Sequence, residues 1–124
     1  MAVTAKEDIT LIRGNSVNIS FKIWQTAPSG VTLGVPQDLT GKVLAFRAAW
    51  LAPTEGQLTK TSAGGDIIFT DQEEGEALMV LTFAETRLLP AGVVIEYELE
   101  YRDGSDQRTV KSGFINAVGG VNSD

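Results

Sequence analysis

The chain has 124 residues and a formal net charge of −6 at pH 7, a length that most simply forms one domain. It contains no cysteine and no histidine, so disulfides, thiolate metal sites and histidine acid–base chemistry are excluded. The basic residues are scattered singly, which argues against nucleic acid or an anionic membrane surface as a partner. No run of about 18 apolar residues is present, so we expect no membrane-spanning helix.

Short strand-like segments separated by turn-forming residues recur along the chain. They are residues 9–12, 17–24, 42–50, 58–62, 67–70, 77–83, 93–101 and 107–116. In the clearest segment, residues 93–101, apolar side chains alternate with Glu96, Glu98 and Glu100. Such alternation is typical of an antiparallel sheet with one dry face and one wet face, because successive strand side chains point to opposite sides.

Two other segments leave an alternative open, and a third predicts a helical turn. Residues 42–50 are apolar on both faces apart from Arg47, as expected of a central strand, although their alanines also allow a helix. The link 25–37 is rich in proline and glycine and forms either a short edge strand or a contact surface. Residues 84–89 predict one helical turn, which Pro90 closes.

Together these segments predict an all-β sandwich of seven or eight mainly antiparallel strands. We expect residues 1–8 to form an N-terminal arm, residues 9–118 the sandwich, and residues 119–124 a C-terminal tail. The core is predicted from apolar positions of the strands: Val17, Ile19, Phe21, Ile23, Leu44, Phe46, Ile67, Leu81, Phe83, Ile95, Tyr97, Leu99 and Phe114.

The acidic stripe of residues 93–101 is one candidate chemical site. Successive carboxylates on one face of a strand lie about 7 Å apart, too far to share a cation tightly without a second loop. Arg108 and Lys111 lie on the next predicted strand and could pair across to the glutamates. We interpret the stripe as a solvated sheet face.

Two acidic turns are weaker candidates. Residues 103–106 resemble a calcium loop only faintly, because the spacing of the ligands and the distal glutamate are absent. Residues 71–76 form a second acidic turn. We interpret both as solvated turns and expect no catalytic residue, no cofactor and no metal.

A resemblance to a known family rests on the order of several short motifs. The motifs are residues 9–21, Asp38-Leu39-Thr40-Gly41, Gly65-Asp66-Ile67, Asp71 with Gly75, Thr82-Phe83-Ala84-Glu85-Thr86, Leu89-Pro90-Ala91-Gly92 and Asp103-Gly104. This order resembles the small immunoglobulin-like β-sandwich domains of tailed-bacteriophage virion proteins, including the N-terminal domain type of baseplate upper proteins. The likeness spans residues 9–116.

The resemblance implies an immunoglobulin-like layout and a non-enzymatic structural role in a bacteriophage virion. Because the sequence has no coiled-coil or fibre region, we expect a head decoration or cement protein, with a baseplate or tail-fibre adaptor as the alternative. The implied partners are capsid subunits or tail and baseplate subunits, and the chain is expected to form a homo-oligomer. Lacking a signal region, it is expected to be made in the bacterial host cytoplasm and to reside in the virion.

Two other classes of function stay open. A carbohydrate-binding or adhesin module is the main rival, because sandwiches of this size often carry sugars. Such a module favours clustered exposed aromatic residues, whereas the aromatic residues here are few and mostly alternate inward. An enzyme needs carboxylates that face each other across a cleft, and nothing in the sequence places a pair in that way.

The partner interface is predicted in the link 25–37. Val31, Leu33 and Val35 alternate there without an obvious place in the core, and exposed apolar residues in a long structured loop favour contact with a partner. Trp50 and Leu51 are further candidates, because Leu51 continues the apolar end of a strand into a loop.

Overall fold

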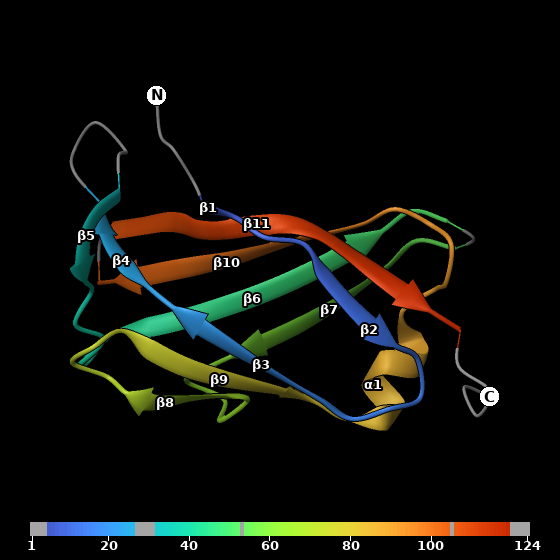
Figure 1. The fold of residues 1–124 in the computed structure, drawn as a ribbon, viewed down its shortest axis with the longest axis horizontal. Coiled ribbons are helices and arrows are strands. Elements are labelled where there is room, and N and C mark those ends of the chain that lie inside the picture. Colours follow the sequence, from blue (N-terminus) through green and yellow to red (C-terminus); the bar gives the residue numbers. More distant parts are fainter. Residues whose placement is uncertain (1–4, 27–31, 53, 105, 120–124) are drawn as a thin grey trace.

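Two β-sheets face each other across a shared apolar core (Figure 1). The computed structural model describes residues 5–26, 32–52, 54–104 and 106–119. Within these ranges the protein consists of strands and one short helix, α1 (Phe83–Leu88), which confirms the all-β prediction. No helix in the described ranges is long and apolar enough to cross a membrane.

The larger sheet is built around the C-terminal hairpin. In the described residues it contains β1 (Ala5–Lys6), β2 (Ile9–Ile12), β6 (Val43–Trp50), β7 (Gly56–Thr61), β10 (Ile95–Asp103) and β11 (Asp106–Val118). The strand order is β1-β11-β10-β6-β7, and β2 also pairs with β11. β1 and β2 run parallel to β11, whereas the other pairings in this sheet are antiparallel.

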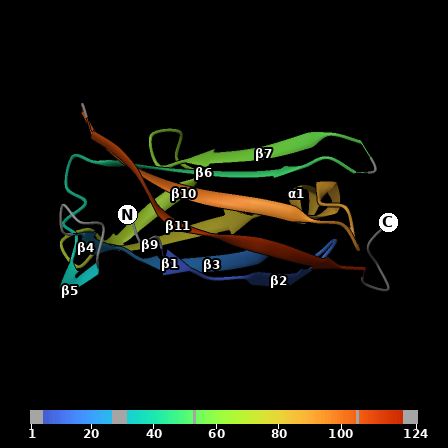
Figure 2. The same cartoon turned by 90° about the horizontal axis from the view of Figure 1, so that it is seen from above.

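The smaller sheet has the order β3-β9-β8 and is antiparallel. Its strands are β3 (Val17–Lys22), β8 (Ile67–Asp71) and β9 (Glu76–Leu81). A separate antiparallel pair is formed by β4 (Trp24–Thr26) and β5 (Thr32–Pro36). Figure 2 shows β6 and β7 on one side of the molecule and β3 on the other. The eleven strands of the described ranges exceed the predicted seven or eight because the N-terminal arm and the link 25–37 also form strands.

The two segments with the most distinctive apolar patterns occupy the middle of the larger sheet. β10 alternates buried and exposed residues, as its sequence predicts. β6 lies between β10 and β7, and Leu44, Ala45, Phe46 and Ala48 are buried, whereas Arg47 is exposed. The helix alternative for residues 42–50 is therefore wrong, because a strand flanked on both sides satisfies its backbone and buries most of its apolar side chains.

Aromatic rings connect the two sheets through the core. Phe46 on β6 stacks on Tyr97 on β10, with ring centroids 5.4 Å apart. Phe46 also contacts Phe21 on β3, at 6.4 Å. The predicted core residues that are buried are Phe21, Ile23, Leu44, Phe46, Ile67, Leu81, Ile95, Tyr97 and Leu99, while Val17 and Ile19 are partly buried against them.

Two predicted core residues are on the surface: Phe83 is 52% exposed and Phe114 is 50% exposed. Thr82 ends the strand geometry and caps α1, so Phe83 is already the first helical residue and turns outward. In β11 the inward positions belong to Ile115 and Ala117. Phe114 has the opposite phase and therefore lies on the wet face.

Polar contacts hold α1 at one end of the sheets. Thr82 and Glu85 form a reciprocal capping box at its start, and the buried Lys60 on β7 makes an ion pair with Glu85. At the other end, Arg13 donates its Nε to the Leu89 carbonyl at 2.7 Å. The helix is thus tied both to β7 and to the turn after β2, although it is too short to be stable alone.

The start and end of the β4–β5 pair are fastened at Gly75. The N–H of Ile23 donates to the Gly75 carbonyl at 2.8 Å, and the N–H of Gln37 donates to the Ile23 carbonyl at 2.9 Å. Gly75 has a φ of +70°, and an added Cβ would collide with the Ile23 carbonyl and lie 2.9 Å from the Gln37 carbonyl. Only glycine fits this backbone crossing.

We therefore expect Gly75→Ala to destabilise the protein by more than about 2 kcal/mol, because backbone strain of about 1–2 kcal/mol is added to the collision. Gly65→Ala is the matched control. Gly65 also has a positive φ, +84°, but no heavy atom lies within 4 Å of its added Cβ, so it should lose only the strain energy. Urea unfolding followed by circular dichroism measures both, and equal losses would contradict the packing role of Gly75.

Candidate functional site

The link 25–37 does carry exposed apolar side chains. Leu33 and Val35 lie on β5 and are 51% and 48% exposed. Within the described ranges β5 pairs only with β4, so the edge-strand alternative for this link is confirmed. Val31, the third predicted residue, lies outside the described residues.

Trp50 and Leu51 lie at the end of β6, where the chain leaves the sheet. Trp50 is half-buried, and its ring lies over Gly56, where an added Cβ would be only 2.6 Å from the ring. Leu51 is 81% exposed. The ring of Trp50 therefore covers the start of β7, and Leu51 is the more accessible of the two.

The structure does not bring the predicted interface residues into one surface. β5 lies at one end of the molecule, and β6 runs from that end to the other, where Trp50 and Leu51 are found (Figure 1). A single neighbouring subunit docked on one end would contact either Leu33 and Val35 or Trp50 and Leu51. Contact of each pair with a partner stays a prediction.

Sequence reasoning missed a second exposed apolar group, which we call the apolar corner. It consists of Ile12, Val94, Phe114 and Val118, each between 44% and 68% exposed. Ile12 and Val118 are directly paired across β2 and β11. The signal for Phe114 and Val118 was present in the sequence, because Ile115 and Ala117 set the opposite phase for the inward side of β11.

Next to the apolar corner, the outer face of the larger sheet, which points away from the core, carries the glutamates of β10. Glu96 lies between Ala49 on β6 and Phe114 on β11, and Glu98 lies between Arg47 and Ser112. Within the described ranges neither carboxylate makes a hydrogen bond or an ion pair. The predicted wet face is confirmed, and within the described ranges its Glu96 and Glu98 carboxylates have no partner.

The basic residues expected to pair with this stripe have other partners. Lys111 makes an ion pair with Glu7 at 2.9 Å. Arg108 makes an ion pair with Asp106 at 3.0 Å, and its guanidinium lies over the ring of Tyr101. The proposed pairing across to the stripe is therefore wrong for both. Arg108 lies opposite Tyr101, on the inward side of β10. A register shift between Leu99 and Glu100 places Lys111 opposite the inward Leu99, whereas the register of the hairpin would have placed it opposite Glu98.

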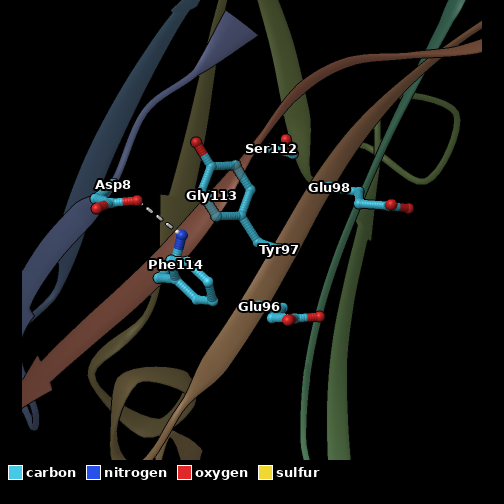
Figure 3. A pocket seen from close by; sticks show the side chains of 7 residues that line it. All are labelled: Asp8, Glu96, Tyr97, Glu98, Ser112, Gly113 and Phe114. Atoms are coloured by element: carbon cyan, nitrogen blue, oxygen red, sulfur yellow. Dashed lines mark hydrogen bonds between the residues drawn. The ribbon is translucent and has the colours of Figure 1, made fainter. Parts of the chain in front are cut away.

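The described part of the outer face includes three adjoining hollows. One hollow, of about 480 Å³, lies over β10 and β11 and is bounded by Asp8 (Figure 3). A second lies between β6 and β10 over Ala49, and a third lies between β6 and β7 over Ala49 and Gly56. The first and second hollows share Glu96 and Glu98, and the second and third share Arg47 and Ala49. We call this row of hollows over β11, β10, β6 and β7 the channel.

Tyr97 closes the floor of the first hollow from below. Figure 3 shows its ring on the opposite side of β10 from Glu96 and Glu98. Its hydroxyl donates to the backbone carbonyl of Glu7. That carbonyl approaches because Gly113 has no side chain, and a Cβ there would lie 2.5 Å from it. A buried tyrosine thus ties the N-terminal segment to the sheet.

Within the described ranges no group of three or more His, Cys, Asp or Glu side chains is placed to hold a metal ion. In the turn of Asp71 and Glu74, the Glu74 N–H donates to the Asp71 backbone carbonyl at 3.2 Å and to the Asp71 carboxylate at 3.4 Å. Asp103 makes an ion pair with Lys42 at 2.9 Å.

The Tyr97 contact predicts a pH dependence of stability. Burial, with the nearby Glu7 and Asp8 carboxylates, raises the pKa of Tyr97 to about 12 from 10.0. The folded state therefore holds the phenolic proton more tightly than the unfolded state. The resulting stabilisation is complete below pH 10 and is lost as the pH rises to about 12.

We expect Tyr97→Phe to be less stable than the original chain by about 1 kcal/mol at pH 8, through loss of one hydrogen bond. The difference in the free energy of unfolding should shrink between pH 10 and 12, because only the original chain has this phenol to ionise. Urea titrations at several pH values measure both. A difference that stays constant up to pH 12 would contradict the tight protonation of Tyr97.

Comparison with known proteins adds no family to these observations. No family model matches the chain. No curated protein matches it either.

Proposed function

We propose that this chain is a non-enzymatic structural subunit of a tailed-bacteriophage virion, most simply a head decoration or cement protein. It would act by protein–protein contact, with capsid subunits as partners, and would be made in the bacterial host cytoplasm. The order of sequence motifs over residues 9–116 supports the phage assignment. The two-sheet fold supports it only at the level of architecture, since one fold serves many functions.

We also propose that the two facing sheets form an immunoglobulin-like sandwich. The antiparallel core of each sheet, β10 with β6 and β7 in one and β3 with β9 and β8 in the other, is consistent with that layout. The Phe21–Phe46 contact joins the two sheets. In this proposal β1, β4 and β5 are additions to the basic sandwich.

The observation that carries a binding role is the distribution of exposed apolar side chains. Leu33 and Val35 occupy one end of the molecule, and the apolar corner lies on the outer face of the larger sheet. Exposed apolar groups favour protein partners where they lie together, as Ile12 and Val118 do across β2 and β11. A subunit with two such surfaces can contact two neighbours, as assembly on a particle or in a homo-oligomer requires.

A baseplate or tail-fibre adaptor is the second candidate, because the motif order is shared with baseplate upper proteins. A carbohydrate-binding module is the candidate from another class. Phe114 is exposed beside polar side chains, which is the one observation that favours it. A single exposed aromatic ring on this hollow is a weaker sugar platform than a cluster of rings.

Immunogold electron microscopy tests the location. An antibody raised against the purified chain should label the head of purified particles of the phage that encodes it. Label at the tail tip would favour the adaptor. Absence of the chain from purified particles by mass spectrometry would overturn the virion assignment.

The predicted interface is tested by Leu33→Ser with Val35→Ser in one variant and Leu51→Ser in another. All three side chains are about half exposed or more, so we expect each variant to keep its melting temperature within a few degrees. The Leu33/Val35 variant should lose incorporation into particles or oligomers, measured by co-sedimentation. Unaltered assembly in both variants would show that neither end is the interface.

A further inference from the structure

We propose that the channel on the outer face of the larger sheet binds a basic, extended segment of a partner protein. This inference deepens the proposed function, because it names the chemistry of the segment that a neighbouring subunit would present. It rests on three observations about the face: its shape, its charge and its exposed ring.

The shape comes from small residues in the middle of the sheet. Ala49 on β6 lies between Gln57 on β7 and Glu96 on β10, and the small Ser112 on β11 lies beside Glu98. Because neighbouring strands lie about 4.8 Å apart, four strands span about 14 Å. An extended peptide rises about 3.3 Å per residue, so about four residues can lie across the channel.

The charge selects the occupant. The side chains that line the hollows include four carboxylates, those of Asp8, Glu55, Glu96 and Glu98, and one guanidinium, that of Arg47. The Nε of Arg47 donates to Gln57 at 3.0 Å, and no ion pair joins Arg47 to a carboxylate within the described ranges.

A lysine- or arginine-bearing segment therefore finds the Glu96 and Glu98 carboxylates exposed and without an ion-pair partner within the described ranges, and it can pair with both. The same face of a second copy would bring like charges together. Electrostatic complementarity thus favours a basic partner over face-to-face self-association.

Phe114 supplies the apolar anchor. Its ring is half exposed and lies beside the Glu96 position, and its own N–H is fixed by the Asp8 carboxylate at 3.0 Å (Figure 3). A lysine or arginine stem can pack on such a ring while its charged end reaches a carboxylate. The rest of the apolar corner continues the contact surface towards the end of the sheet.

Two synthetic hexapeptides are the probes, one alternating lysine and valine and one alternating glutamate and valine. Binding to the isotope-labelled chain is followed by NMR titration at low salt. We expect the basic peptide to shift the amide signals of Ala49, Glu96, Glu98 and Phe114, and the acidic peptide to shift none. Raising the salt to 0.5 M should weaken binding.

The variant Glu96→Gln with Glu98→Gln should weaken binding of the basic peptide by about tenfold, as expected for the loss of two partly exposed charge pairs. The matched control is Glu73→Gln with Glu74→Gln, which removes the same charge from an exposed turn elsewhere and should change the affinity less than about twofold. Phe114→Ser tests the anchor and should also weaken binding. Circular dichroism melting checks that all three variants remain folded.

Equal loss of affinity in the channel and control variants would show non-specific attraction and would overturn the proposal. A failure of the basic peptide to bind, or amide shifts confined to another face, would do the same. A neutral oligosaccharide that binds at Phe114 independently of the two glutamates would assign the channel to sugars instead.

The peptide result is separable from the virion assignment. Specific binding by a chain that is absent from particles would leave the channel standing and remove the proposed function. If the original chain is present in particles but does not bind the basic peptide, and if the Glu96/Glu98 variant incorporates normally, only the channel proposal is removed.

Discussion

The fold depends on one aromatic contact between strands that are far apart in the sequence. The Phe46 ring stacks on Tyr97 within the larger sheet and also contacts Phe21 in the smaller sheet. Tyr97 also fixes the N-terminal segment, because its hydroxyl donates to the Glu7 carbonyl. One line of contacts therefore runs from the smaller sheet through the core to the N-terminal segment. Buried aromatic residues suit this position because each offers a large apolar surface, and tyrosine adds a polar end.

The polar contacts at the two ends of the sheets have a different role, because they pair backbone groups that would otherwise be buried without a hydrogen-bond partner. At one end Arg13 satisfies carbonyls at the C-terminus of α1, and Lys60 reaches Glu85 at its start. At the other end the Gly75 crossing lets backbone groups pair directly. Charged side chains therefore reach the helix at one end, and a glycine allows direct backbone pairing at the other.

The surface proposals follow from this scaffold. A rigid sheet holds Glu96, Glu98 and Phe114 in fixed relative positions, whereas Leu33 and Val35 lie on a two-stranded pair at its margin. A face of this kind can select a partner by charge and shape, because the rigid sheet needs little ordering on binding. The two surfaces would then serve distinct contacts, one chosen by charge and one by apolar burial.

The sequence alone determined what depends on local pattern. Residues 93–101, 17–22 and the one-turn helix followed from alternation, turn residues and a closing proline, and so did the wet face of glutamates. The tertiary structure decided what depends on distant residues. The hairpin register placed Arg108 opposite Tyr101, and the register shift at Leu99 placed Lys111 opposite Leu99, so neither faces the glutamates. The cap at Thr82 and the phase of β11 placed Phe83 and Phe114 outside the core. The length of β6 separated Leu33 and Val35 from Trp50 and Leu51. Alternation tells which residues share a face of one strand, but only pairing between strands decides which face is buried and which side chains become neighbours.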